Sequence, residues 1–480
     1  MSVASNALID IFGSENVIDD VTTLTAYSRD ESFTNPLRPW HIVKPRCIEE
    51  VQKLVRWANQ TGTPLVPVSS GPPHFNGDTI PSAPGAVIVD LGAMSKIINI
   101  DRRNRVAQIE PGVTYGQLQP ELAREGLRLT TSLLPRPNKS VVASLLEREP
   151  RLVPRFQWSA LDPLRCIEVV WGDGQKLTSG NGDAVSAMAP YYPYGPAQTD
   201  FYRLLSGAQG SMGIVTWASV KCEVAPQVHK LFFVQDNKLD GLIDFTYKLL
   251  RFRFGDELLL LNCAQLAYIL ESEPELVKRL IGDLPPWTVM VGIAGRNHLP
   301  VERTTFLEKD ISEIAQNLGL QLKNEIPGAR NRKIADAVFT PSRAPEWKLE
   351  YKGGRQDIFF VSTLERAGSF VSTVQKVAEE EGYNTREIGI YIQPIQQGAA
   401  CHFEFSFPYE RDNKKEFSRM KALYHKTSEA LFRQGAYFAR PYGAWAQPTF
   451  NRDMQTAIAL KKIKSIFDPN NIMNPGKLIF

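Results

Sequence analysis

Polar and aromatic side chains alternate along one segment near the carboxyl-terminal end of the chain. His402, Glu404 and Ser406 are interleaved with Phe403, Phe405 and Phe407. In a β-strand successive side chains point to opposite faces, so the polar set shares one face and the phenylalanines share the other. Imidazole and carboxylate groups can both move protons. The pattern indicates either a face that takes part in chemistry or a solvated outer face.

A second cluster with chemical potential consists of Arg148, Arg151 and Arg155. Guanidinium groups bind carboxylates and phosphates through paired hydrogen bonds, so this cluster would suit an anionic substrate. A solvated, charged surface is the alternative.

The local motifs of several other enzyme classes are absent from the sequence. The glycines of residues 207–213 precede a strand instead of opening a helix, which excludes a Rossmann dinucleotide loop. There is no Walker lysine loop, HExxH or GxSxG motif. The six histidines are dispersed and the five cysteines form no CxxC pair, so we expect neither a metal site nor a cysteine-ligated cluster.

Composition sets the class of protein. The 480 residues correspond to roughly two to four domains, and the 43% hydrophobic content predicts an ordinary core. A net charge of +3 is too small to indicate a nucleic-acid-binding surface. The first residues are acidic and lack the pattern of a signal peptide, and no apolar run is long enough to span a membrane. We therefore expect a cytoplasmic protein.

Short strands and amphipathic helices must position these side chains. The first half predicts helices over 47–62 and 115–125, strands over 64–68, 86–90, 105–110 and 214–222, and a hairpin formed by 166–171 and 175–178. The middle predicts strands over 231–234, 258–261, 288–293, 358–363, 388–392 and 402–407, with helices over 301–318 and 369–380. This alternation favours a mixed sheet covered by helices.

Several segments together resemble the vanillyl-alcohol oxidase and p-cresol methylhydroxylase (PCMH-type) family of FAD enzymes. They are 44–46 (KPR), 89–92 (VDLG), 110–115 (EPGVTY), 168–174 (EVVWGDG), 192–195 (YPYG), 210–216 (GSMGIVT) and 468–477 (DPNNIMNPGK). Each motif is weak alone, but their order and spacing cover nearly the whole chain.

The resemblance implies an α+β fold, in which a PCMH-type FAD-binding domain is split by a cap domain with a mostly antiparallel sheet covered by helices. It predicts domains at 1–226 (FAD-binding), 227–425 (cap and substrate) and 426–480 (a segment that returns to the FAD domain). The FAD-binding residues that it implies are Ser69, Ser70, Gly71, His74, Asn76, Gly77, Pro111, Gly112, Val113, Ser140, Gly210, Gly213, Ile214, Val215, Tyr351, Asn474 and Lys477. Of these, Tyr351 is a candidate for covalent attachment of FAD. His74 would contact phosphate or flavin, or cap the loop.

The sequence departs from the family pattern in two places. Residues 69–77 read SSGPPHFNG, and Pro72 and Pro73 lack the N–H groups that relatives offer to the pyrophosphate. Residues 140–154 carry bulky side chains and arginines where relatives place glycines against the flavin. Arginines could replace the missing donors.

The resemblance also implies catalytic candidates. Phe75 occupies the position of a phenol-binding tyrosine, and Arg440 that of an arginine which holds phenolate or carboxylate, with Ala439 replacing its tyrosine partner. Tyr442 would supply a hydroxyl nearby. His402 and Glu404 become acid–base candidates, because the family's cap sheet faces the flavin.

Three functions follow from this reading. The first is an FAD-dependent oxidoreductase, a dehydrogenase more than an oxidase, that transfers a hydride from a small aromatic alcohol, alkylphenol or hydroxy acid and passes electrons to a partner protein or oxygen. The second is a flavin-free subunit that pairs with a flavin-carrying partner in a complex. The third is a non-redox enzyme in the inherited cleft. A homo- or hetero-oligomer, such as a dimer, is expected.

Overall fold

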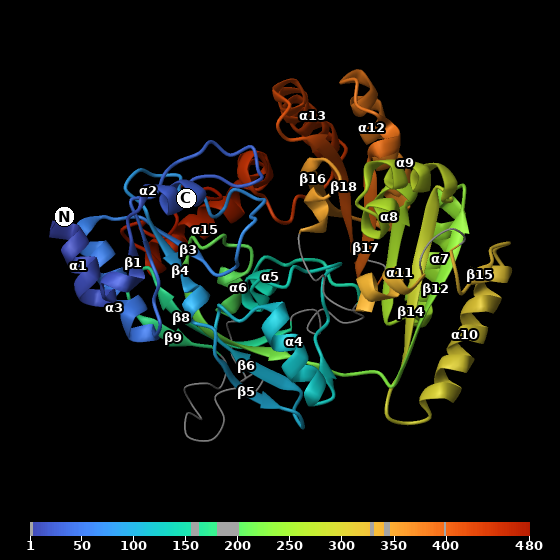
Figure 1. Ribbon diagram of the computed structural model, residues 1–480, viewed down its shortest axis with the longest axis horizontal. Helices are drawn as coiled ribbons and strands as arrows, with labels where there is room; N and C mark the ends of the chain where they lie inside the picture. Colours follow the sequence, from blue (N-terminus) through green and yellow to red (C-terminus); the bar gives the residue numbers. More distant parts are fainter. Residues whose placement is uncertain (1–2, 155–162, 180–200, 327–330, 340–345, 398–399) are drawn as a thin grey trace.

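The computed structural model describes residues 3–154, 163–179, 201–326, 331–339, 346–397 and 400–480. Arg155 and the motif at 192–195 lie outside these ranges. Figure 1 shows two lobes side by side, with both ends of the chain in the left lobe. The predicted boundaries near 226 and 425 stay our proposal, and we use "amino-terminal part", "cap" and "carboxy-terminal segment" in that sense.

A four-stranded sheet lies close to the amino terminus. Its order is β1-β2-β4-β3, with β2, β4 and β3 parallel and β1 antiparallel to β2. The predicted helix over 47–62 is α3, which ends at Gly62 in the left-handed conformation that favours glycine. The elements here are α1 (Val3–Phe12), β1 (Val17–Ile18), α2 (Val21–Ala26), β2 (His41–Val43), α3 (Ile48–Thr61), β3 (Leu65–Val68) and β4 (Val87–Asp90).

A five-stranded antiparallel sheet, β5-β6-β10-β8-β9, completes the amino-terminal part. It contains the predicted hairpin as β8 and β9. Thr114 and Gln117 form a reciprocal capping box that fixes the start of α4. The elements are β5 (Ile97–Asp101), β6 (Val106–Ile109), α4 (Tyr115–Arg124), β7 (Leu127–Arg128), α5 (Val141–Leu146), β8 (Leu164–Trp171), β9 (Lys176–Thr178), α6 (Tyr202–Leu205), β10 (Gly213–Lys221) and β11 (Glu223–Val224).

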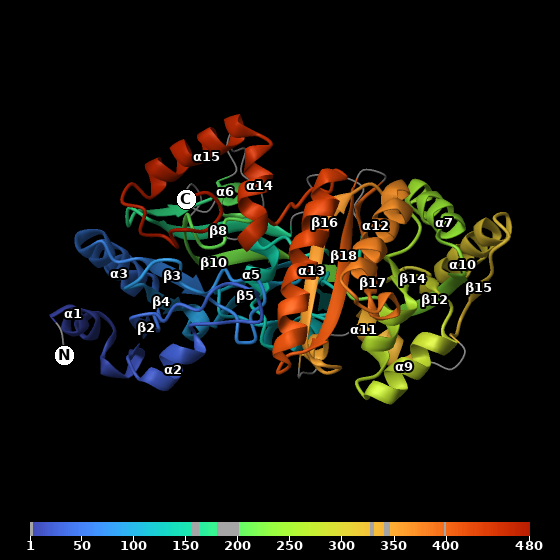
Figure 2. The ribbon, with the colours of Figure 1, turned by 90° about the horizontal axis from the view of Figure 1, so that it is seen from above.

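The cap is built on a seven-stranded sheet, β15-β12-β14-β13-β17-β18-β16, whose neighbouring strands are all antiparallel. Figure 2 shows α13 lying along β16 and β18. The elements are β12 (Val228–Asp236), α7 (Leu239–Phe252), β13 (Glu257–Asn262), α8 (Cys263–Leu270), α9 (Pro274–Asp283), β14 (Trp287–Gly295), α10 (Pro300–Gln316), β15 (Leu322–Lys323), α11 (Asn331–Phe339), β16 (Gly353–Ser362), α12 (Ala367–Glu380), β17 (Gly389–Gln396), β18 (Ala400–Glu410) and α13 (Lys414–Arg433).

The two faces of the cap sheet have different roles. Phe403, Phe405 and Phe407 of β18 are fully buried in a cluster with residues of α7, α10, α12 and α13. Phe403 stacks on Phe360 of the neighbouring strand at 5.3 Å between ring centroids. Burial of each phenylalanine contributes about 1.5–3 kcal/mol. The other face packs on α8, α9 and α11, and part of it remains free to line a cavity.

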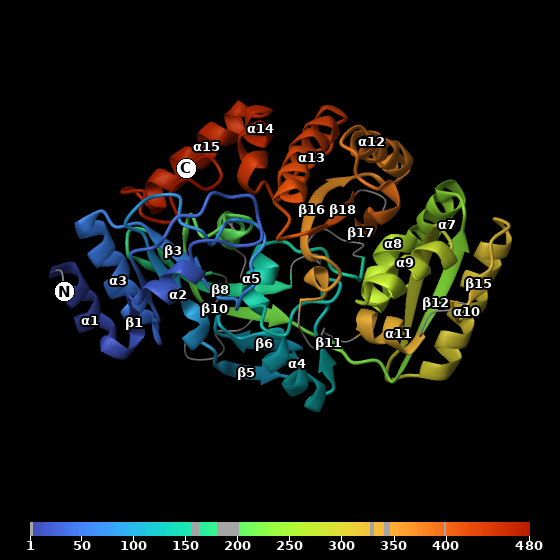
Figure 3. The ribbon, with the colours of Figure 1, turned by 45° about the horizontal axis from the view of Figure 1, so that its top comes forward.

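The carboxy-terminal segment returns to the amino-terminal part. Figure 3 shows α15 (Met454–Phe467), preceded by α14 (Ala446–Asn451), above the blue and green elements of that part. Beyond α15, Met473 pairs with Leu65 of β3, and the Leu65 N–H donates to the Ile472 carbonyl at 2.8 Å. The tail therefore extends the sheet that carries the cofactor-type loop. None of the described helices is long and apolar enough to cross a bilayer.

Candidate functional site

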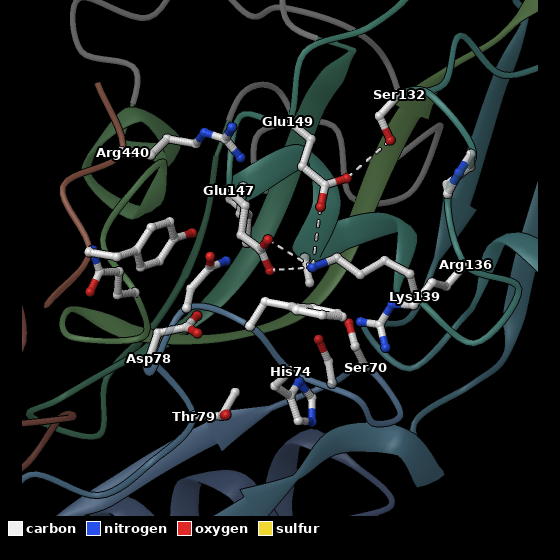
Figure 4. Close-up of a pocket in the computed structure, with 18 of the residues that line it drawn as sticks. Ser70, His74, Asp78, Thr79, Ser132, Arg136, Lys139, Glu147, Glu149 and Arg440 are labelled. Atoms are coloured by element: carbon white, nitrogen blue, oxygen red, sulfur yellow. Dashed lines mark hydrogen bonds and ion pairs between the residues drawn. The ribbon is translucent and has the colours of Figure 1, made fainter. Parts of the chain in front are cut away.

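A cavity of about 270 Å³ lies between the amino-terminal part and the cap. Its walls come from segments that are far apart in the sequence: the loop after β3, both ends of α5, residues 205–215, strands β16 and β18, and the stretch around Arg440. Figure 4 shows the side chains of the amino-terminal wall, with Arg440 reaching over it.

The loop after β3 supplies polar groups to the lower wall. Ser69, Ser70, His74 and Asn76 all line the cavity. Burial, together with the nearby positive charges of Arg136 and Lys139, lowers the pKa of His74 to about 3. His74 is therefore neutral at physiological pH and can act as a hydrogen-bond donor and acceptor.

Arg136 ties this loop to the cap. Its guanidinium lies over the Phe75 ring at 5.8 Å, and Nη1 donates to the Gly71 carbonyl at 3.1 Å. Its Nε lies 3.3 Å from Glu346 of the cap. Arg136 thus holds the loop in its observed shape and links the amino-terminal part to the cap.

The two loop prolines do not occupy the cavity wall. Pro72 and Pro73 line a second depression together with Arg29 and Arg411, next to the cavity through His74, which lines both. Neither proline lines the cavity itself. The ligand-facing side of the loop is made by its serines, His74 and Asn76.

Two glycines allow the cavity walls to approach each other. A Cβ on Gly112 would lie 2.5 Å from the Leu91 carbonyl oxygen, and one on Gly210 would lie 2.6 Å from the Pro67 ring. Gly210 also has a φ of +70°, which disfavours any other residue. Glycine at these positions allows the surrounding segments of the protein to pack closely against each other.

A buried lysine and two glutamates form the wall next to α5. Lys139 Nζ lies 2.6 Å from Glu147 Oε1 and 3.5 Å from Glu149 Oε1. Glu149 also accepts hydrogen bonds from Ser144 at 2.5 Å and Ser132 at 3.2 Å. The positive charge and these hydroxyls outweigh burial and hold the pKa of Glu149 below its usual range. Glu149 is therefore ionised near neutral pH and stabilises this wall through its contacts with Lys139 and the two serines.

The polar face of β18 looks into the cavity, as the alternation predicted. Glu404 lines the cavity and lies 3.0 Å from Lys348 Nζ. His402 is buried behind it, with Nε2 3.4 Å from Glu404 Oε2. Burial lowers the pKa of His402. Burial alone would raise that of Glu404, but Lys348 and His402 outweigh it and hold it well below its usual value.

Strand β16 adds a second layer of charge beside β18. Asp357 lies opposite Ser406 in the ladder and accepts a hydrogen bond from its hydroxyl at 2.6 Å. Arg355 Nε lies 2.9 Å from Asp357, and Lys348 Nζ lies 2.6 Å from the same carboxylate. These contacts compensate the buried charges and fix the cap wall.

Two amides of the cap wall retain unused hydrogen-bonding atoms. Gln265 is 1% exposed and Gln356 is 8% exposed, and both line the cavity. Gln265 Nε2 and Gln356 Oε1 have no hydrogen-bond partner among the described residues. Because an unpaired buried polar atom costs about 1–3 kcal/mol, these atoms are suited to meet a bound molecule.

Arg440 and Tyr442 complete the cavity. The Arg440 guanidinium carbon lies 4.0 Å from the centroid of the Phe359 ring. Tyr442 is buried, which raises its pKa well above the usual value and keeps its hydroxyl protonated. Together with Phe359, whose ring lies 6.2 Å from that of Tyr442, they make a wall that is both aromatic and cationic.

The predicted site residues divide into two groups. Lining the cavity are Phe75, Glu404, Arg440, Tyr442, Ser69, Ser70, His74, Asn76, Pro111, Gly210, Gly213, Ile214 and Val215. Behind its surface lie His402, Gly71, Gly77, Gly112, Val113, Ser140, Tyr351, Asn474 and Lys477.

Most residues of the second group hold the first in place. Ser140 caps α5 by accepting from the Ala143 N–H at 3.0 Å. Asn474 donates to the carbonyls of Asp78 and Gln209, and so joins two loops of the cavity. Tyr351 packs on Tyr268 at 5.2 Å in the cap core, so the structure does not bring it to the cavity as the prediction required.

Sequence reasoning missed several cavity residues. They are Asp78, Thr79, Arg136, Lys139, Glu147, Glu149, Gln265, Glu346, Lys348, Arg355, Gln356 and Asp357. The alternation of Arg355 and Asp357 could have been found by the same period-two argument as His402 and Glu404. By contrast, Arg148 donates to Ser206 at 2.8 Å and neither it nor Arg151 lines the cavity. The expected replacement of donors by these two arginines is not what the structure shows.

The residues present fit an FAD molecule. The loop offers hydroxyl, amide and imidazole groups beside the cations Arg136 and Lys139, as an anionic pyrophosphate requires. On the cap wall, Gln265 Nε2 and Gln356 Oε1 have no hydrogen-bond partner among the described residues and can bind a polar group of the cofactor or substrate.

Comparisons with known proteins also indicate an FAD-binding protein. Residues 39–149 match the FAD binding domain family, and residues 449–478 match the C-terminal domain of FAD linked oxidases. An uncharacterized FAD-linked oxidoreductase of Mycobacterium tuberculosis is 30% identical over 99% of both chains. The D-2-hydroxyglutarate dehydrogenase of Stutzerimonas stutzeri is 24% identical over 96% of both.

The fold has a counterpart among solved structures. The 4-ethylphenol oxidase from Gulosibacter chungangensis, in its isoeugenol complex, superimposes with a TM-score of 0.86 at 20% identity, covering 99% of this chain and 96% of that one. The predicted α+β fold and the predicted FAD cofactor are confirmed, and the flavin-dependent enzyme is the one of the three alternatives that these findings support. The chain belongs to the FAD-linked oxidoreductases of the vanillyl-alcohol oxidase and p-cresol methylhydroxylase type.

Proposed function

We propose that the protein is a dehydrogenase of a small hydroxy acid, whose carboxylate is held by Arg440. The observation that carries the proposal is that Arg440, alone among the cations of the described cavity lining, makes no direct ion pair with a described carboxylate. Five cations line the cavity within the described residues, and four of them form ion pairs: Arg136 with Glu346, Lys139 with Glu147, Lys348 with Asp357 and Glu404, and Arg355 with Asp357. Arg440 forms no ion pair with a described carboxylate and contacts the face of Phe359.

An anionic substrate would give Arg440 the direct ionic partner that it lacks among the described residues. A guanidinium binds a carboxylate through two parallel hydrogen bonds, and it is more weakly hydrated than an ammonium. The Phe359 ring keeps the guanidinium in place from one side and leaves its other side for the ligand. The hydroxy-acid dehydrogenase among the relatives is in line with this choice.

A phenol is the second candidate, and the aromatic wall favours it. Phe75, Trp347 and Phe359 line the cavity, and the 4-ethylphenol oxidase shares the fold. However, Phe75 and Ala439 lack the hydroxyl groups that would bind a phenolate oxygen. A phenolate would therefore have fewer donors here than a carboxylate, which can use both guanidinium nitrogens.

We also propose roles for the cofactor and for the other polar residues of the cavity. When bound, FAD supplies a two-electron oxidant. Arg440 would orient the substrate, and Tyr442 would donate a hydrogen bond to its oxygen. Glu404 and His402 are acid–base candidates on the cap wall. We further propose that electrons leave to a partner protein or to oxygen, and that the protein forms a homo- or hetero-oligomer.

The test begins with the visible spectrum of the purified protein. Under anaerobic conditions, 2-hydroxyglutarate, lactate, glycolate, 4-cresol and 4-ethylphenol are then compared for their ability to bleach the flavin. We expect a hydroxy acid to reduce it, and Arg440→Ala to raise KM for that acid by about 10²-fold or more, since a charge-assisted hydrogen bond is worth about 1.5–3 kcal/mol. Arg440→Lys should recover only part of the loss.

The matched control is Arg433→Ala, because Arg433 is exposed and its ion pair with a described residue is with Glu429 of its own helix. It should leave KM unchanged. Reduction by a phenol alone would support the second candidate. Wild-type affinity for the acid in the Arg440→Ala variant would overturn the role of Arg440.

A further inference from the structure

Glu147 has fewer side-chain partners than Glu149, its neighbour in the same wall of the cavity. It stands at the carboxyl end of α5 and lines the cavity. Both of its oxygens contact a single group, Lys139 Nζ, at 2.6 and 2.7 Å. Glu149, two residues later, has Lys139 and two serine hydroxyls as partners. Glu147 is thus the less engaged of the two.

The charges around Glu147 do not balance. Asp78 on the loop, Glu147 and Glu149 share the Lys139 ammonium, and Figure 4 shows all four groups around one open space. Arg440 of the carboxy-terminal segment faces the same space in Figure 4, and Tyr442 of that segment also lines the cavity. Burial, together with the negative charges of Glu149 and Asp78, outweighs Lys139 and raises the pKa of Glu147 to about 7. A carboxylate in this state can take up or release a proton near neutral pH.

The alternative bases on the cap wall are more firmly held. Glu404 is bound by Lys348 and His402, and its pKa is held well below its usual value. His402 does not reach the cavity surface. Protonation of Glu404 would weaken its favourable contacts with Lys348 and His402. Protonation of Glu147, by contrast, relieves its electrostatic repulsion from Glu149 and Asp78.

We propose that Glu147 is the catalytic base that accepts the hydroxyl proton of the substrate. In the oxidation the C–H bond would break with its hydrogen leaving together with the electron pair as a hydride to the oxidant, the O–H bond would break with its proton going to Glu147, and a C=O bond would form. The substrate loses two electrons and FAD, the oxidant, gains them. Lys139 keeps its contact with Glu149 throughout. This role rests on the function proposed above.

A measurement without substrate tests the ionisation. The absorbance of the oxidised flavin is titrated between pH 5 and 9 in the wild type and in Glu147→Gln. We expect a spectral change near neutral pH in the wild type that the variant lacks. A transition that persists in Glu147→Gln, or is absent from both proteins, would overturn the assignment, whatever the substrate is.

A single-turnover measurement tests the catalytic role. Anaerobic flavin reduction by 2-hydroxyglutarate or lactate is followed against pH. Glu147→Gln should slow it by about 10²–10⁴-fold and abolish the rise of rate with pH. Glu147→Asp keeps a carboxylate and should keep the rise. Lys139→Met removes the charge that favours the ionised form, so the rise should move to higher pH.

The competing assignments are tested in parallel. Glu404→Gln and His402→Asn should retain the rise of rate with pH. If Glu404→Gln abolishes it and Glu147→Gln does not, Glu404 is the base and the proposal is wrong. If neither acid reduces the flavin of the wild type, the hydroxy-acid function fails, while the substrate-free titration still decides whether Glu147 ionises in this range.

Discussion

The Lys477 ammonium donates hydrogen bonds to the backbone carbonyls of Gly77 and Ile80, each at 2.7 Å, across 400 and 397 residues of sequence. Its stem is buried, and burial lowers the pKa of its ammonium. The sequence motif suggested direct contact with the cofactor. The structure shows instead that Lys477 fixes the end of the loop that lines the cavity.

This relationship predicts that Lys477→Met loosens the loop. Two hydrogen bonds from a charged donor are lost, so the free energy of unfolding should fall by about 2–4 kcal/mol and bound FAD should dissociate faster. Flavin fluorescence released during a thermal ramp measures both effects. Lys461→Met, at an exposed position, is the control. Equal FAD retention in both variants would contradict a positioning role.

The position of Pro72 outside the cavity predicts that its substitution leaves FAD binding unchanged. Because Pro72 lines the outer depression and not the cavity, Pro72→Ala restores an N–H group without adding a ligand contact. We expect its Kd for FAD to stay within about twofold of the wild type. Arg136→Met, which loses the Gly71 and Glu346 contacts, should bind FAD more weakly. Fluorescence titration of the apoprotein distinguishes the two. A tenfold gain in affinity from Pro72→Ala would place the proline at the cradle after all.

An interdomain ion cluster predicts how stability depends on pH. Glu257 of the cap lies 2.9 Å from Arg128 of the amino-terminal part and 2.8 Å from His229. Burial alone would raise the pKa of Glu257, but the His229 hydrogen bond and the Arg128 charge outweigh it and hold it below its usual range.

A carboxyl whose pKa is lower in the folded state stabilises the fold above its unfolded pKa of about 4.3 and loses that contribution as pH falls through the folded value. The melting temperature of Glu257→Gln should therefore lie below that of the wild type at pH 7, and the gap should close below about pH 4. Scanning calorimetry in parallel buffers checks this. A gap that does not change with pH would show that the loss is one of packing.

The buried face of β18 predicts a purely structural loss. Phe405→Ala should lower the free energy of unfolding by about 3–5 kcal/mol, since Phe405 is fully buried in the cap core. Its side chain faces away from the cavity, so any molecules that remain folded should keep their KM. Chemical denaturation and steady-state kinetics separate these effects, and a raised KM with unchanged stability would reverse the assignment of the two faces.

Local periodicity was sufficient to predict β18 correctly. Alternation places His402, Glu404 and Ser406 on one face, and the structure confirms that Glu404 reaches the cavity. The glycine stop at Gly62 likewise fixed the end of α3. In both cases the information lies within a few residues of the chain, where steric preferences act directly.

Contacts between distant segments could not be obtained in this way. Lys139 and Glu147 flank α5, and nothing in their spacing says that they share a cavity with Asp78 and Arg440. The direction in which Pro72 points depends on packing against Asn138, whose Nδ2 donates to the Pro72 carbonyl at 2.7 Å. The family resemblance supplied the fold and the region of the site, but not which side chains of a loop face inward.

The return of the tail to β3 has a consequence for the order in which the protein is made. Leu65 is synthesised early, yet its partners Ile472 and Met473, and the Lys477 that secures the loop, leave the ribosome only after the entire cap. The sheet at the cofactor loop therefore stays one strand short during synthesis, while the cap sheet can form. Stable loading of FAD should accordingly follow translation of the tail, and a nascent chain that stops before it should hold the cofactor poorly.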